Sequence, residues 1–481
     1  MDYILPLIER FMTGVYDAND EFLEDLSRFS ELEGKIHSLS NELAAGILSG
    51  ILTSAGKLIE KSHRRKQGYN VQRHDSRTLI STVGDVTFED IYYRNKETGK
   101  YVYLLDKLLH LPAHERLTTL AEAKLVSEAT VYSYQHAADQ LAIGDQKVSK
   151  VTVQNKVWET KANLIVEEEP EPVHKRQTEY LYIEADEDHI HRQKNGREDG
   201  CMIGKLIYLF EGKEDVCEGR RRLIKPHYFG GLYPGEMNAS LWDEVERFIE
   251  KHYDTDVLKR VYISSDGGSW IKAAKDHIDR SVLVADRFHL MKYINRVCRL
   301  TDDENLNKGR FYKYIWKKDQ TSVRKLLTRI ENTYGQARQI DEARTFFENN
   351  WKEVIRAFHD KHVFGCSAEG HVSNVFSDRM SSRPMGWSEI GSDSMCKLRC
   401  YVRNYGRDKV VDLVAWRREK EFERQSLQAT GTDGLIEPEQ KKRYSLEQRR
   451  DFVYIEKLQA TLSDKRQVKK ALAIREQIGN I

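Results

Sequence analysis

The sequence predicts an α/β domain that follows a mainly helical region with a small β-meander. Between residues 179 and 285, apolar strands alternate with helical segments, a pattern that gives a sheet with helical crossovers. Residues 1–77 and 111–166 carry helical patterns, and the β-branched and aromatic range 78–110 separates them. Residues 287–365 are charged and show no strand pattern, so we expect a helical insertion in the α/β domain.

Composition limits the class of protein. The chain has 481 residues, enough for about three domains. It carries 77 Lys+Arg against 76 Asp+Glu and is 40% hydrophobic, which excludes a disordered chain and a uniformly basic DNA-coating protein. Six cysteines without a CxxC pair argue against a zinc ribbon. No signal peptide pattern opens the chain, and the apolar stretch 43–56 is short and serine-rich, so we expect a cytoplasmic protein without a membrane partner.

The N-terminal helical region, residues 1–77, ends in a basic segment. Apolar residues recur at helical spacing from Leu32 to Leu58, and Arg64, Arg65 and Lys66 follow. This segment is either a solvated helix end or a contact for nucleic acid. The range 78–110, with Gly84 in its first turn, is expected to form an antiparallel meander.

Residues 111–166 contain a pattern typical of a helix-turn-helix. A helix ends near Gly144, and Ser149 can cap a second helix that carries Lys150, Gln154 and Asn155. These side chains suit base edges and phosphates. A helical hairpin that only packs remains the alternative. A fragment of residues 1–166 is expected to bind DNA with an affinity that falls as salt rises.

An acidic, proline-containing linker at 167–178 separates this region from the α/β domain, residues 179–425. Within the domain, strands are expected at 180–186, 202–210, 260–265 and 281–285, and the helical insertion at 287–365. Residues 426–481 are expected to form a polar helical tail.

Three carboxylates are candidate metal ligands. Asp186 and Asp266 end predicted strands, and Glu369 lies in a later helical segment. Carboxyl ends of strands gather functional groups, and carboxylate oxygens suit Mg²⁺, two ions of which assist phosphodiester displacement. An aspartate at a strand end is also a common turn former. Glu184, Glu187 and Asp188 compete with Asp186 for the ligand role.

Other residues that follow Glu369 in the sequence each have two possible roles. His371 is a candidate for phosphate contact or for a hydrogen bond behind the ligands, since Mg²⁺ prefers oxygen. Arg379 and Arg383 suit phosphates or intrachain ion pairs. Trp387 suits stacking on an unpaired base or burial in the core.

Several motifs together resemble one family. They are YIEADEDH at 182–189, SDGGSWIK at 265–272, DRFHL at 286–290, SAEGHVS at 367–373 and SDRMSSRPMGW at 377–387. The chain resembles the ISLre-two family of bacterial insertion-sequence transposases, relatives of the Mutator-like group, over nearly its whole length.

The resemblance implies an RNase H-like catalytic domain whose DDE triad falls on Asp186, Asp266 and Glu369. It adds a motif formed by Asp286 and His289. It implies two Mg²⁺ ions, with Mn²⁺ as a substitute, and double-stranded DNA as partner, both terminal inverted repeats and target. A homodimer or higher oligomer is expected, cytoplasmic in a bacterium and nucleoid-associated when bound to DNA.

Two alternatives stay open. One is an RNase H-like nuclease that cuts without joining, and the other is a non-catalytic helix-turn-helix DNA-binding protein. The insertion has its own pair of readings. Its basic residues around Trp316, including Lys317 and Lys318, suit contact with the DNA end, and a dimerisation or purely structural bundle is the alternative.

Overall fold

A computed structural model describes residues 3–426 apart from 142, 163, 166–169, 194–199 and 384. The predicted tail beyond residue 426 and residues 167–169 of the predicted linker lie outside the described residues. The chain divides into two compact units. Unit 1 comprises Met1–Leu125, Gln135–Lys150 and the described part of Val414–Ile481, and unit 2 comprises Val126–Tyr134 and Val151–Leu413.

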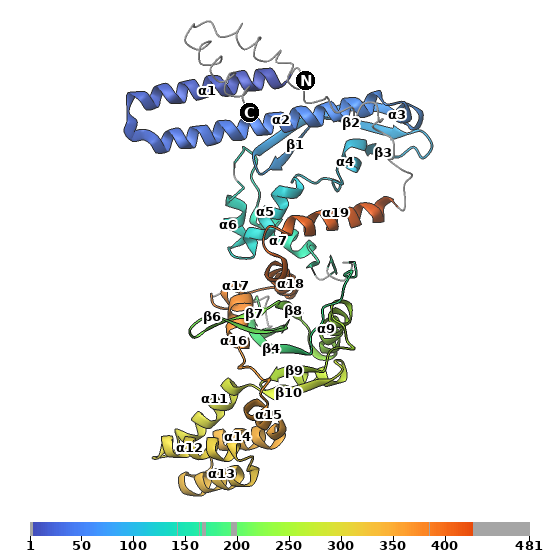
Figure 1. Cartoon of the computed structure of the whole chain (residues 1–481). Helices are drawn as coiled ribbons and strands as arrows, with labels where there is room; N and C mark the ends of the chain where they lie inside the picture. Colours follow the sequence, from blue (N-terminus) through green and yellow to red (C-terminus); the bar gives the residue numbers. More distant parts are fainter. Residues whose placement is uncertain are drawn as a thin grey trace. The chain divides into compact units, whose positions relative to one another are not determined.

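Unit 1 begins with a helical hairpin beside a three-stranded antiparallel sheet (Figure 1). Its elements are α1 (Ile4–Glu24), α2 (Phe29–Lys61), α3 (His63–Gly68), β1 (Tyr69–Ser81), β2 (Gly84–Asn95), β3 (Tyr101–Tyr103) and α4 (Leu104–Leu108). Ile59 of α2 packs with Phe88 and Tyr93 of β2 and with Leu104 in one core. By length and composition, the helical stretch Leu26–Lys61 is also able to cross a membrane.

The meander begins earlier than the sequence predicts. β1 starts at Tyr69 rather than at residue 78, and its first half pairs with the last residues of β2, Tyr69 opposite Asn95. The segment 69–77 is therefore strand, not the end of a helix. Residues 104–108, partly expected as strand, form α4.

The predicted region 111–166 is shared between the two units. Its helices are α5 (Thr119–Ala129), α6 (Tyr134–Asp139) and α7 (Lys150–Glu159), and residues 126–134 and those from 151 onward belong to unit 2. The last described helix, α19 (Val410–Ser426), passes from unit 2 into unit 1 at Val414. The division at residues 110, 166 and 425 expected from the sequence therefore differs from that of the structure.

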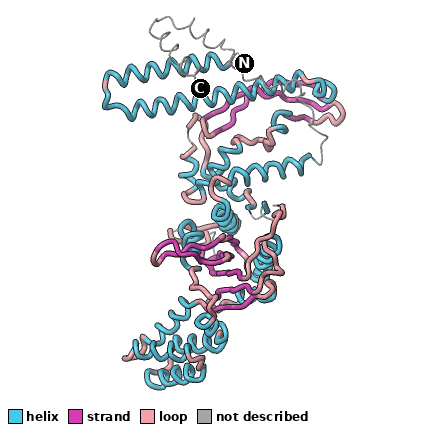
Figure 2. Tube along the Cα trace, in the orientation of Figure 1, coloured by secondary structure: helices cyan, strands magenta, loops and turns pink. Residues whose placement is uncertain are grey.

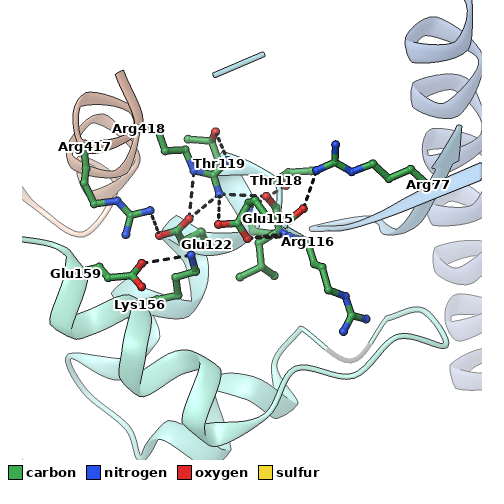
Figure 3. Close-up of polar contacts among 12 residues, drawn as sticks. Arg77, Glu115, Arg116, Thr118, Thr119, Glu122, Lys156, Glu159, Arg417 and Arg418 are labelled. Carbon is green, nitrogen blue, oxygen red and sulfur yellow. Dashed lines mark hydrogen bonds and ion pairs between the residues drawn. The ribbon is translucent and has the colours of Figure 1, made fainter. Parts of the chain in front are cut away.

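A buried arginine joins α19 to the rest of unit 1 (Figure 3). The side chain of Arg418 is 1% exposed, and its Nη2 lies 2.5 Å from Oε2 of Glu122, whose side chain is 0% exposed. The same guanidinium lies 3.6 Å from Glu115 Oε2 and donates to Thr119 Oγ1 and to the carbonyl of Leu117. Two segments far apart in the sequence thus share one buried ion pair.

Unit 2 contains a mixed five-stranded sheet in the order β10-β9-β4-β5-β8. The strands are β4 (Tyr180–His191), β5 (Cys201–Phe210), β8 (His227–Leu232), β9 (Arg260–Ser265) and β10 (Ser281–Ala285). β4, β9 and β10 are parallel, and β5 pairs antiparallel with both β4 and β8. A hairpin of β6 (Gly212–Cys217) and β7 (Arg220–Ile224) follows β5. The mixed α/β architecture was predicted.

One face of this sheet is covered by α9 (Asn238–His252). Trp242 and Val245 of α9 pack with Ile183 of β4 and Ile263 of β9 in the core. Odd-numbered residues of β4 enter this core, so its even-numbered residues point to the opposite face. The short α10 (Ser269–Lys272) follows β9.

The insertion is helical in all its described elements (Figure 2). They are α11 (Arg287–Cys298), α12 (Glu304–Trp316), α13 (Gln320–Tyr334), α14 (Arg338–Asn349) and α15 (Trp351–His359). Phe311, Leu327 and Phe347 form part of a second core, which the helices share with Ala285 at the end of β10. After it come α16 (Ala368–Val372), a π-helical turn (Ser373–Ser377), α17 (Asp378–Met380) and α18 (Glu389–Tyr405).

Candidate active site at the edge of the mixed sheet

Strand register brings three aspartates to one edge of the sheet. Glu184 of β4 pairs with Ser264 of β9, and Ser265 pairs with Ala285 of β10. Asp186 and Asp266 each lie two residues beyond the first pair, and Asp286 lies one residue beyond β10. Asp186 does not end its strand, as the sequence predicted, because β4 continues to His191 beyond the ends of β9 and β10. Because the three strands are parallel neighbours, Asp266 and Asp286 follow the ends of β9 and β10 at the level of Asp186.

Burial and neighbouring negative charges shift the pKa values of the side chains at this edge. Burial raises the pKa of Asp186 to about 6, with further increases from the carboxylates of Asp266 and Asp286. The backbone N–H of Glu187 and the nearby His289 act in the opposite direction. The pKa of His289 is itself raised, first by its hydrogen bond to Asp286 and then by the same carboxylates.

Asp286 connects this edge to the insertion. Its carboxylate accepts from the backbone N–H of Phe288 and caps the start of α11, as expected for an aspartate at an N-cap. Its other oxygen lies 2.8 Å from Nδ1 of His289. The Asp286–His289 pair of the DRFHL motif is therefore in contact, and the charges of Asp266 and Asp186 also act on His289.

The loop after β9 fixes Asp266. Oδ1 of Asp266 accepts from the N–H of Gly268 at 2.8 Å, and Ser265 Oγ accepts from Gly267 at 3.0 Å. Gly267 has φ +104°, in the region that a side chain would strain. Gly267 is thus needed for the turn that carries the carboxylate.

Two acidic residues of β4 hold the segment that contains Glu369. Glu184 accepts from the backbone N–H of Ser367 at 2.6 Å, and Asp188 accepts from Ser381 Oγ at 2.9 Å. Glu184, Asp186 and Asp188 share one face of β4 because side chains alternate along a strand. The segment 367–381 therefore lies along this face, with Asp186 between its two attachment points.

The buried carboxylate of Glu184 has several hydrogen-bond and ion-pair partners. Its side chain is 3% exposed, and Lys213 Nζ lies 2.9 Å from its Oε1. The hydroxyls of Tyr208 and Ser367 also donate to it. A carboxylate with its charge compensated in this way anchors the chain and is not free to take a metal. Asp186 is therefore a better ligand candidate than Glu184.

Glu369 lies in the first turn of α16, two residues after the Ser367 anchor, and is exposed. α16 packs against β4, so the fold delivers Glu369 to the same strand as Asp186. In the described part of the chain, three ligand atoms lie within 4.8 Å of one another at Asp243, Glu246 and His277. The carboxylates of Asp186, Asp266 and Glu369 are more widely spaced than that.

Two DNA-contact candidates are buried instead. Arg379 is 5% exposed and donates to the carbonyl of Ala129, and Trp387 is 6% exposed and donates to the carbonyl of Met380. The guanidinium of Arg379 lies 4.8 Å from the Trp387 ring centroid. These residues stabilise unit 2, which corrects the expectation of phosphate contact and base stacking. Arg383 is exposed.

His371 faces aromatic residues. Its Nδ1 lies 2.9 Å from Tyr228 OH, and its ring packs on Tyr208 at 4.3 Å between centroids. Burial lowers its pKa, so the neutral ring is favoured. His371 is thus held between two tyrosines of β5 and β8, and its role beside the candidate ligands stays a prediction.

The N-terminal DNA candidates differ in exposure. Arg64 and Lys66 on α3 are exposed, whereas Arg65 donates to the carbonyl of Glu60 and lies over the Tyr93 ring. On α7, Lys150 and Asn155 are exposed and Gln154 is half-buried.

Sequence comparison identifies the family. The family described as "Uncharacterised protein family (UPF0236)" matches residues 22–418. The chain belongs to the UPF0236 family. A UPF0236 protein of Caldanaerobacter subterraneus subsp. tengcongensis is 33% identical over 89% of this chain and 89% of its own length, and its name covers eleven loci of that genome. A second UPF0236 protein of the same organism, whose name covers four loci, is 33% identical over 89% of this chain and 89% of its own length.

Among solved structures, this UPF0236 chain is similar to the Drosophila P element transposase strand transfer complex. The TM-score is 0.20 at 11% identity, covering 66% of this chain and 88% of that chain. A score this low does not establish a shared fold.

Proposed function

We propose that the chain is the DDE transposase of a bacterial insertion sequence, with the mixed sheet of unit 2 as its RNase H-like catalytic domain. The observation that carries the proposal is the edge where Asp186, Asp266 and the Asp286–His289 pair meet. The motif resemblance to the ISLre-two family supports it. Occurrence of one relative at eleven loci of a genome is also what the copying of a mobile element leaves.

The residues at this edge fit divalent cations. Asp186, Asp266 and Glu369 offer hard oxygen atoms, the donor type that Mg²⁺ prefers and Mn²⁺ also accepts. Burial is the main cause of the raised pKa of Asp186, and the carboxylates of Asp266 and Asp286 add to it. Two bound Mg²⁺ ions would supply charge stabilisation for the attacking and leaving oxygens of a phosphodiester.

The protein's own residues position the reacting groups. Asp266, held by its glycine turn, and Asp186, held between two anchors of β4, form a rigid edge. His289, held by Asp286, would supply a proton to the leaving 3′-oxygen. Water attacks phosphorus and the P–O3′ bond breaks. The freed 3′-hydroxyl then attacks a target phosphate and displaces its 3′-oxygen, so no covalent enzyme–DNA intermediate forms.

Replacing Asp186 by Asn should stabilise the metal-free protein near neutral pH. A carboxyl whose pKa rises from 3.8 to about 6 on folding disfavours the folded state when ionised. The gain in Tm should be largest above pH 6 and disappear as the pH falls toward 3.8. Thermal melts over a pH series measure it. Asp279→Asn, at an exposed position, should show no such gain, and an equal gain there would contradict the explanation.

A cleavage and joining assay tests the proposal. Purified full-length chain, Mg²⁺ and labelled DNA carrying the inverted repeats that flank the gene should give 3′-hydroxyl ends and then joined products. Cleavage without joining would support the nuclease alternative. DNA binding without cleavage would support the non-catalytic alternative. We also expect the active species to be a dimer or larger, since two ends must be joined.

A further inference from the structure

The small sheet of unit 1 leaves three tyrosine rings on an open face. Tyr103 of β3 pairs with Tyr92 of β2, and Tyr101 pairs with Arg94. Residues directly opposite one another in a sheet share a face, so these side chains point to the same side. Tyr93, on the other side, is buried in the core with α2.

The rings form a short stack. Tyr92 lies between the other two, with its ring centroid 5.4 Å from Tyr101 at an interplanar angle of 11° and 4.7 Å from Tyr103. Tyr101 is 53% exposed, so one end of the stack is open to solvent. An exposed, fixed aromatic ring offers a surface on which a planar group can stack.

Arginines complete the stack. The guanidinium carbon of Arg73 lies 4.5 Å from the Tyr92 centroid, and that of Arg94 lies 5.9 Å from Tyr101. Asp75 accepts from Arg73 Nε at 2.8 Å and from Tyr103 OH at 2.7 Å, which fixes both side chains. We call Arg73, Tyr92, Arg94, Tyr101 and Tyr103 the arginine–tyrosine patch.

Positive charge surrounds the patch. The turn between β2 and β3 carries Lys96 and Lys100 against Glu97, and Lys96 Nζ donates to the carbonyl of Lys66 at 2.5 Å. The exposed Lys66 and Arg64 of α3 are therefore neighbours of this turn. Aromatic rings bordered by cations are the combination that binds single-stranded nucleic acid, by stacking on bases and by attraction to phosphates.

We propose that the arginine–tyrosine patch binds DNA at an unpaired base, which stacks on the outer face of Tyr101. Arg94, Lys96 and Lys100 contact the adjoining phosphates. The proposal for the patch rests on the proposed function, because it takes DNA with exposed ends as the substrate. Stacking on a ring does not depend on base identity, so the contact is independent of sequence and adds to any recognition by α7.

Binding of the full-length chain to labelled single-stranded DNA, without divalent ions, tests the patch. Tyr101→Ala should weaken binding roughly tenfold, the effect of one lost stacking contact. Tyr101→Trp should restore it. The matched control, Phe29→Ala, removes an aromatic that is 62% exposed in the same unit and should have no effect. Unchanged affinity of Tyr101→Ala, or a loss equal to that of Phe29→Ala, would overturn the proposal.

Photocrosslinking of the wild-type chain keeps the test independent of variant folding. Oligonucleotides with 5-iododeoxyuridine at an unpaired position should crosslink to Tyr101, whereas crosslinks confined to other residues would refute the patch. The two proposals fail separately. If the wild-type chain cuts inverted-repeat DNA but Tyr101→Ala binds normally, the patch is wrong. If the crosslink forms but no cleavage occurs under any divalent ion, the transposase proposal is wrong.

Discussion

Asp266→Asn is expected to abolish cleavage of inverted-repeat DNA while leaving DNA binding intact. The substitution keeps the size of the side chain and its bond from Gly268, so the turn after β9 is retained. It removes one of the charges that would hold the metal ions. Mutation of a residue that only supports a metal ligand lowers metal affinity or activity by about 10–100-fold. Mutation of a ligand itself should therefore lower the cleavage rate by more than about a hundredfold. Single-turnover cleavage with saturating enzyme measures this loss.

Two further variants sharpen this result. Asp279→Asn makes the same change at an exposed aspartate of unit 2 and should cleave at the wild-type rate. Glu369→Gln should behave like Asp266→Asn if α16 brings Glu369 to the ions, although its carboxylate is exposed in this structure. Near-normal cleavage by Asp266→Asn, or loss of DNA binding together with cleavage, would contradict the assigned role.

The regular parts of unit 2 could be predicted from the sequence because local pattern and tertiary role agree there. The strands at 260–265 and 281–285 match β9 and β10, since each is a short apolar run that ends at an aspartate. The helical insertion was predicted for a similar reason. Its amphipathic helices bury Phe311 and Phe347 mainly against one another, so the local pattern is enough to predict them.

Long-range pairing decides the features that the sequence did not reveal. The first half of β1 contains Arg73, His74 and Asp75, which give no strand pattern, and it is a strand because β2 pairs with it. Glu184 becomes an anchor only through Lys213 and Ser367, far away in the chain. Trp387 and Arg379 have the chemistry of a nucleic-acid contact, and the same chemistry serves a buried cation–π pair.

The sequence does not show that unit 1 is discontinuous, again because contacts between distant parts of the chain decide it. The sequence places α19 at the end of the predicted α/β domain, residues 179–425. The structure buries Arg418 against Glu122 and Glu115. Arg418 and Glu122 are 296 positions apart in the sequence. The folding of the N-terminal residues therefore depends on a helix near the end of the described chain. A fragment of residues 1–166 lacks this partner, which makes it unsuitable for the DNA-binding test that the sequence suggests.

Arg418→Ala is expected to destabilise the protein by up to about 3–5 kcal/mol, the cost of breaking a buried ion pair by removing one partner. The truncation leaves Glu115 without this cation and leaves Glu122 with Arg417 at 2.6 Å. Chemical denaturation should show a lower midpoint, and DNA binding by unit 1 should weaken although Arg418 is 1% exposed. Arg424→Ala, at an exposed position of the same helix, should have little effect. Equal unfolding midpoints for Arg418→Ala and Arg424→Ala would contradict this account.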